Sequence, residues 1–228
     1  MHHYLGVDIG GKDNTWMAVI TEEEGKKPAV QIRLATLQEV VAQCQSENVM
    51  ALAIDAQLTF SISRENGFRA GDEELRGMLS PEFRTRVASY NSLMAVPLRG
   101  TALAATVSPC VGTVIETHPT VCLLLEFGAD IWPDVRAYKL RKADKKKPIP
   151  IAAAKASCQN IWNRWAERFG IEADPELVQQ DGVVDATITA TIAWLYHRQP
   201  ERLQKLGHGP NDEVGRGPFW VVRPRLAV

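Results

Sequence analysis

An acidic residue in the apolar stretch that opens the chain constrains the fold most. Residues 4–20 read YLGVDIGGKDNTWMAVI, in which apolar residues alternate with Gly6 and Asp8 before a Gly-Gly turn. Alternation on both sides of such a turn predicts a β-hairpin. A strand this apolar is expected in the middle of a sheet, where an acid is rarely found without a counter-charge or a metal. The sequence should therefore supply a partner for Asp8 elsewhere.

The composition is typical of one domain with a sizeable core. The chain has 228 residues, of which 45% are hydrophobic and 23% charged, and its net charge is −1. We predict a single domain over residues 1–228 without a general attraction to nucleic acid, so any such binding depends on a local patch. No apolar run reaches the ~18 residues that span a bilayer, and residues 1–11 lack a secretory cleavage pattern. We therefore expect a cytoplasmic protein that does not bind membranes.

Cysteine and histidine spacing argues against a zinc site. No CxxC pair or Cys/His finger spacing occurs, which predicts reduced core thiols rather than disulfides at Cys44, Cys110, Cys122 and Cys158. Paired ligand spacing is also missing among the later histidines, which are expected to be structural or surface residues: His118, His197 and His208.

Strand and helix patterns alternate along the rest of the chain. A third strand is predicted over 28–35, a capped helix over 36–45 and a buried strand over 48–56. A long excursion follows at about 57–108, with helices predicted over 71–79 and 92–107. The remaining predictions are a strand over 111–116, a helix over 120–127, an exposed basic loop over about 128–150, helices over 151–170, 181–198 and 200–207, and a strand over 218–222.

This order of elements predicts the fold class. Three antiparallel strands are followed by a helix, a strand ending in an acid, a helical insertion, and another strand ending in an acid. That is the plan of the ribonuclease H-like fold. We therefore predict an α/β domain with a mixed five-stranded sheet, in which three antiparallel strands are joined by a fourth and a fifth and flanked by helices.

The acids fall at positions that the fold would bring together. Asp55 ends the strand predicted beside that of Asp8, and Glu116 ends the next one. Asp181 and Asp185 are four residues apart, so on a helix they share one face. Asp185 is followed by eleven residues without a charge, so its helix should be largely buried and its beginning must face something that tolerates an anion.

Clustered carboxylates predict a site for hard cations, which prefer oxygen ligands. We expect Mg²⁺ or Mn²⁺ to be held by Asp8, Asp55, Asp181 and Asp185, with Asp8, Asp55, Asp185 and Glu116 as the catalytic acids. Two such ions position and activate water for attack on a phosphodiester. The expected substrate is nucleic acid, DNA or RNA, with Lys12, Lys139 and Arg141 as substrate-binding residues. For Glu116, a ligand role, an outer-sphere role and a salt bridge to Arg or Lys are all open.

The acids lie in the stretches GVDIGGKDNTW, AIDAQL, VIETHPTVC and DGVVDATITATIAWL. With the GDEELR region, SYNSLMAVPLRG, AYK and the closing GPFWV, they resemble the predicted ribonuclease H-like nuclease family known as domain of unknown function 429, over most of the chain. The resemblance implies a ribonuclease H-like fold and a metal site comparable to that of Holliday-junction resolvases, carried onto Asp8, Asp55 and Asp185, with Glu116 and Asp181 as secondary matches.

Other interpretations use the same residues. DIGGK also resembles the first phosphate loop of the actin and sugar-kinase group, which holds ATP and Mg²⁺. Those proteins need two such lobes, whereas this chain has residues for one. A nucleotide- or phosphate-binding protein, or a non-catalytic ribonuclease H-like binding module, is the alternative function. In structural terms, Asp8 would stabilise the hairpin turn and Asp181 would cap its helix.

Overall fold

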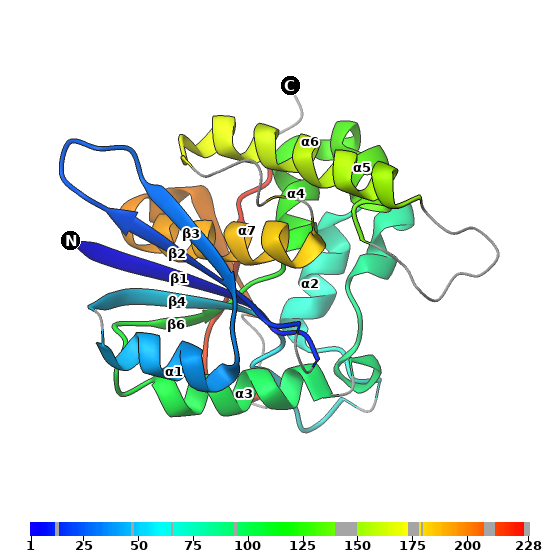
Figure 1. Ribbon diagram of the computed structural model, residues 1–228. Helices are drawn as coiled ribbons and strands as arrows, with labels where there is room; N and C mark the ends of the chain where they lie inside the picture. Colours follow the sequence, from blue (N-terminus) through cyan, green and yellow to red (C-terminus); the bar gives the residue numbers. More distant parts are fainter. Residues whose placement is uncertain are drawn as a thin grey trace.

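A seven-stranded mixed sheet forms the centre of the computed structural model (Figure 1). The structure describes residues 1–11, 14–46, 48–64, 66–93, 95–139, 150–172, 178, 180–207 and 213–225. In spatial order the strands are β3 (Ala29–Leu34), β2 (Trp16–Glu22), β1 (His2–Asp8), β4 (Val49–Asp55), β6 (Val114–Glu116), β9 (Phe219–Val222) and β7 (Leu203–Leu206). Strands β1, β4, β6 and β9 are parallel, and β2, β3 and β7 pair antiparallel with their neighbours.

The α/β class and the three antiparallel opening strands are confirmed, but the prediction of five strands is wrong. The helix predicted over 200–207 ends after one 3-10 turn, η5 (Pro200–Arg202), and continues as β7. One edge of β9 pairs with β6. The other edge of β9 pairs with β7, which satisfies backbone groups that would otherwise be exposed. A second, two-stranded sheet pairs β5 (Thr59–Ser61) with β8 (Glu213–Gly215).

Helices cover both faces of the sheet (Figure 1). Helices α1 (Leu37–Ser46) and α3 (Ala95–Val107) pack on one face. On the other face lie α4 (Pro119–Phe127), α6 (Ile151–Phe169) and α7 (Asp181–Arg198). The excursion after β4 is largely helical, as predicted, with α2 (Ala70–Met78), η1 (Pro81–Arg86), η2 (Tyr90–Ser92) and then α3.

Part of the predicted basic loop is helical. Residues 128–137 form η3 (Gly128–Ile131) and α5 (Trp132–Ala137). Ile131, Val135 and Tyr138 recur at helical spacing and are buried in the core that α6 shares, so packing overrides the charge bias of this segment. Residues 140–149 of the predicted loop lie outside the described residues.

Alternation along β1 decides which side chains reach which layer. Leu5, Val7 and Ile9 belong to the core beneath α1 and α3, whereas Tyr4 belongs to the core beneath α7. Because successive side chains of a strand point to opposite faces, Asp8 lies on the α7 face. No described helix has the length and apolarity to cross a membrane.

Candidate functional site

Asp8 and Asp55 lie side by side at the carboxyl ends of two parallel strands. Their Cα atoms are partners in the register of β1 and β4. Asp55 shares a face of β4 with Ala51 and Ala53, which pack in the core beneath α7. The two carboxylates therefore reach the same face of the sheet because the pairing of β1 with β4 aligns their last residues.

Helix α7 brings the third acid to these two. It packs directly on the backbone of β1 at Gly6, where a Cβ atom would overlap the backbone of Ala186 and Ala190. A Cβ atom on Gly182 would lie 2.2 Å from the side chain of Trp16 and 3.0 Å from Asp8 Oδ2, so the first turn of α7 also needs a glycine. This close approach places Asp185, which is 1% exposed, over the strand ends.

One carboxylate oxygen from each of Asp8, Asp55 and Asp185 lies within 4.8 Å of the other two. We call these three residues the aspartate triad. The prediction that these acids, distant along the chain, meet in one place is borne out by this distance. A set of three carboxylate oxygens is a donor set that suits Mg²⁺ or Mn²⁺.

Asp185 is held by two neighbours from the segment that follows α5. Tyr138 donates its phenolic hydrogen to Asp185 Oδ1 at 2.9 Å, and its oxygen lies 2.7 Å from Thr120 Oγ1. Lys139 Nζ lies 2.9 Å from Asp185 Oδ2. Lys139 was predicted to bind substrate, and it is placed in the site by its ion pair with the triad. Tyr138 was not predicted to be a site residue, although it lies in the AYK stretch of the family resemblance.

The triad carries more negative charge than Lys139 balances. Burial, and then the charges of Asp185 and Asp55, raise the pKa of Asp8 well above its usual range. Burial and the charge of Asp185 raise the pKa of Asp55 to about 7. Burial opposes the ammonium of Lys139, yet the carboxylates, Asp185 first, raise its pKa well above the usual range. A bound divalent cation would relieve the repulsion among these acids.

Glu116 is not part of the triad. Its register partner on β4 is Ile54, which packs beneath α1 and α3, so Glu116 points to the face opposite Asp55. There its two oxygens accept hydrogen bonds of 2.5 and 2.7 Å from the guanidinium of Arg69, and Leu58 N donates to it at 2.7 Å. Of the roles left open for Glu116, the salt bridge is the one the geometry supports.

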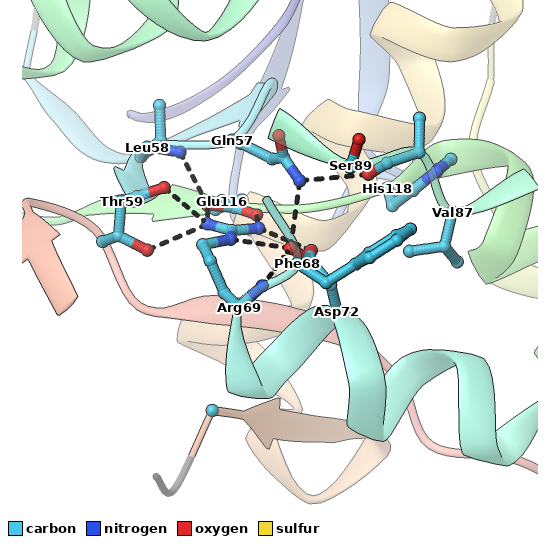
Figure 2. A network of polar contacts seen from close by, with 12 residues as sticks. Gln57, Leu58, Thr59, Phe68, Arg69, Asp72, Val87, Ser89, Glu116 and His118 are labelled. Atoms are coloured by element: carbon cyan, nitrogen blue, oxygen red, sulfur yellow. Dashed lines mark hydrogen bonds and ion pairs between the residues drawn. The ribbon is translucent and has the colours of Figure 1, made fainter. Parts of the chain in front are cut away.

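Arg69 joins Glu116 to a second acid, as Figure 2 shows. Its Nε and Nη2 donate to Asp72 at 3.0 and 2.8 Å. All three side chains are 2% exposed. Arg69 was not predicted; its position two residues before the GDEELR segment carries no charge pattern that distinguishes it from a surface arginine.

Asp181 is the first residue of α7, one turn before Asp185. Burial and the charge of Asp185 raise its pKa, whereas backbone amides at its own position and at Gly182 oppose the rise. Asp181 is not one of the three acids that meet within 4.8 Å. Contact with the first amides of the helix agrees with the alternative role of stabilising its N-terminus. Lys12 and Arg141 lie outside the described residues.

A cavity of about 650 Å³ opens beside the triad. Its lining includes Asp8 and Asp55 of the triad, Glu116, and the side chains of Arg86, Trp132 and Arg136. Its wall also contains two polar side chains that we did not predict to be functional. They are Gln57 and His118, each two residues after an acid that ends a strand, a spacing that could have marked them.

Comparison with protein-family models, with curated proteins and with solved structures gives no match. The resemblance to the predicted nuclease family therefore stays a prediction.

Proposed function

We propose that this chain is a Mg²⁺- or Mn²⁺-dependent phosphodiesterase that hydrolyses nucleic acid, built on a ribonuclease H-like fold. The observation that carries this proposal is the convergence of Asp8, Asp55 and Asp185 within 4.8 Å, beside a cavity that Asp8 and Asp55 line. In an α/β sheet, sites of chemistry lie outside the carboxyl ends of the parallel strands, where this triad lies.

The residues present fit a divalent cation. Three carboxylates supply oxygen ligands, and their mutual repulsion favours either protons or a metal ion. Asp8, Asp55 and Asp185 would hold the cation. When bound, such ions polarise a phosphoryl oxygen and lower the pKa of a water molecule so that it becomes a nucleophile.

The surrounding side chains have separate tasks in this proposal. Tyr138 fixes the orientation of the Asp185 carboxylate through its 2.9 Å hydrogen bond. Lys139 contributes a positive charge beside the triad, where it pairs with a phosphate oxygen of the substrate. Arg86 and Arg136 give the outer part of the cavity a positive charge that attracts the nucleic-acid backbone.

Cleavage assays with matched variants test this function. Labelled single-stranded, duplex and branched DNA and RNA are incubated with the protein and Mn²⁺, with EDTA as the blank. Asp8→Asn and Asp185→Asn should each lower the cleavage rate at least about 100-fold, since even outer-sphere partners of a metal cost 10- to 100-fold. Asp134→Asn, an acid on α5 outside the cavity, is the control and should retain full activity.

Two results would reject the proposal. One is cleavage by Asp8→Asn and Asp185→Asn at the rate of the unmodified chain. The other is the absence of Mn²⁺-dependent cleavage on every substrate. If ATP raised the melting temperature without any cleavage, the nucleotide-binding alternative would replace the nuclease.

A further inference from the structure

Two hydrogen-bond acceptors in the cavity wall have no partner. They are Gln57 Oε1 and His118 Nδ1, which are buried and unpaired among the described residues. Buried polar atoms are almost always hydrogen-bonded, so an unpaired acceptor that lines a cavity indicates a donor on a ligand. Both residues line the cavity beside the triad.

The amide of Gln57 has one possible orientation. Its Nε2 donates to Asp72 Oδ2 at 3.1 Å and to Ala88 O at 3.2 Å. Both partners are oxygens that only accept, so the NH₂ group must face them and the carbonyl oxygen must face away. Figure 2 shows this oxygen turned away from Asp72. Gln57 is 6% exposed, and water in bulk does not satisfy it.

The ring of His118 is fixed in the same way. Its Nε2 lies 2.9 Å from the carbonyl oxygen of Arg86, which only accepts, so Nε2 carries the hydrogen. Burial, followed by the charge of Lys139, lowers the pKa of His118, which favours the neutral ring. In the neutral ring Nδ1 is an acceptor. Gln57 and His118 therefore both donate a hydrogen bond to the backbone segment 86–88. In each side chain the remaining acceptor atom has no partner among the described residues.

Basic side chains in the cavity lining offer a place for an anionic group, and two of the acids in the same lining, Asp72 and Glu116, are already paired with Arg69. The guanidinium groups of Arg86 and Arg136 lie 5.0 and 5.7 Å from the centre of the Trp132 ring, and Lys139 lies at the triad. A ligand that suits the whole cavity has a phosphate at the triad and N–H donors at the other end. A volume of about 650 Å³ is large enough for a small organic ligand.

We propose that this cavity takes one nucleotide unit of the substrate, with its base turned out of the strand so that an exocyclic amino group donates to Gln57 Oε1 and His118 Nδ1. This inference rests on the proposed function. An amino group carries two N–H donors and can satisfy two acceptors, as in adenine, cytosine and guanine. Uracil and thymine carry one N–H donor and would leave an acceptor unpaired. The site should therefore prefer amino-bearing bases.

The matched pair of cytidine and uridine 5′-monophosphate tests this preference. Both are titrated calorimetrically into the protein with Mn²⁺, and neither contains a phosphodiester bond that hydrolysis would remove. Leaving a buried acceptor unpaired should weaken binding of the uridine nucleotide at least about fivefold. Equal affinities, or no binding of either nucleotide, would overturn the inference.

Three variants separate the acceptors from the fold. His118→Phe removes Nδ1 together with the Nε2–H that bonds Arg86 O and introduces no new acceptor, and Gln57→Met removes Oε1. Each should reduce the cytidine preference towards one. Arg76→Met is the control, because Arg76 donates to Arg84 O and Val87 O from outside the cavity. It loosens the same segment and should keep the preference.

The measured quantity is the ratio of the affinities for cytidine and uridine 5′-monophosphate. A variant that is partly unfolded has less protein able to bind either nucleotide, so this ratio does not change. If Gln57→Met does not fold, His118→Phe decides alone; a full cytidine preference in that variant contradicts the inference. The two proposals fail separately. Mn²⁺-dependent cleavage without any base preference would reject only this one, whereas a cytidine preference without cleavage would reject only the phosphodiesterase.

Discussion

Replacing Asp55 with asparagine should stabilise the metal-free protein, and most strongly above pH 7. In the folded chain burial and the charge of Asp185 raise the pKa of Asp55 from 3.8 to about 7. A group whose pKa rises on folding destabilises the folded state as pH increases from its unfolded to its folded pKa. The destabilisation of the folded state by Asp55 therefore grows as the pH rises from 3.8 to about 7, and it reaches its full size above pH 7.

The magnitude follows from the size of this shift. A rise from 3.8 to about 7 corresponds to about 4 kcal/mol. Because Asp55 is only partly buried, water reduces this figure, and we expect the variant to gain about 1 to 4 kcal/mol at pH 8. For a chain of this length that is a rise of about 2 to 16 °C in melting temperature. Near pH 4 the gain should be small.

Thermal and urea unfolding in EDTA measure this gain at pH 4, 6 and 8. Asp134→Asn is again the matched control and should change stability little at any of these pH values. Adding Mn²⁺ should reduce the advantage of the variant, because a ligand at 100 times its dissociation constant stabilises the unmodified triad by about 2.7 kcal/mol. If Asp55→Asn were less stable than the unmodified chain at pH 8 in EDTA, the carboxylates would not repel one another as argued.

Two further predictions concern the framework of the site. Gly6→Ala should lower the free energy of unfolding by about 1 to 3 kcal/mol or more, since a Cβ atom there overlaps the backbone of α7, whereas Gly77→Ala on α2 has open space and should be neutral or stabilising. Equal urea midpoints for the two variants would contradict this. Arg69→Met should cost about 3 to 5 kcal/mol because it leaves two buried acids without their cation, and adding Glu116→Gln should restore part of that loss in the same urea assay. No recovery in the double variant would show that Arg69 acts by packing alone.

Local pattern accounts for the part of the fold that the sequence predicts. Alternation identified β1, β2 and β3, and the acids at the ends of β1 and β4 were found because an acid is unexpected in an apolar strand. Asp185 was found because a long uncharged helix follows it. These signals lie within a few residues of each acid, so a single sequence contains them.

The parts that were missed depend on pairing between distant segments. Glu116 and Asp55 both end strands after an isoleucine, yet β6 pairs with β4 so that Glu116 is level with Ile54. That difference of one residue turns Glu116 to the opposite face, and nothing in either strand specifies it. The ion pair of Lys139 with Asp185 and the pairing of β7 with β9 likewise join segments whose proximity is set by the whole fold.

The contact of α7 with the bare backbone of Gly6 has a consequence for engineering. This contact holds β1 and α7, which carry Asp8 and Asp185, directly against each other. Strand β4, which carries Asp55, is held to β1 by the backbone hydrogen bonds of the sheet. The rest of the cavity lining, in contrast, comes mainly from the excursion after β4, from the segment after β6 that carries His118, and from α5. A library that randomises residues 86–88 and the exposed side chains of α5 would therefore alter which ligand is selected while the acidic centre keeps its shape.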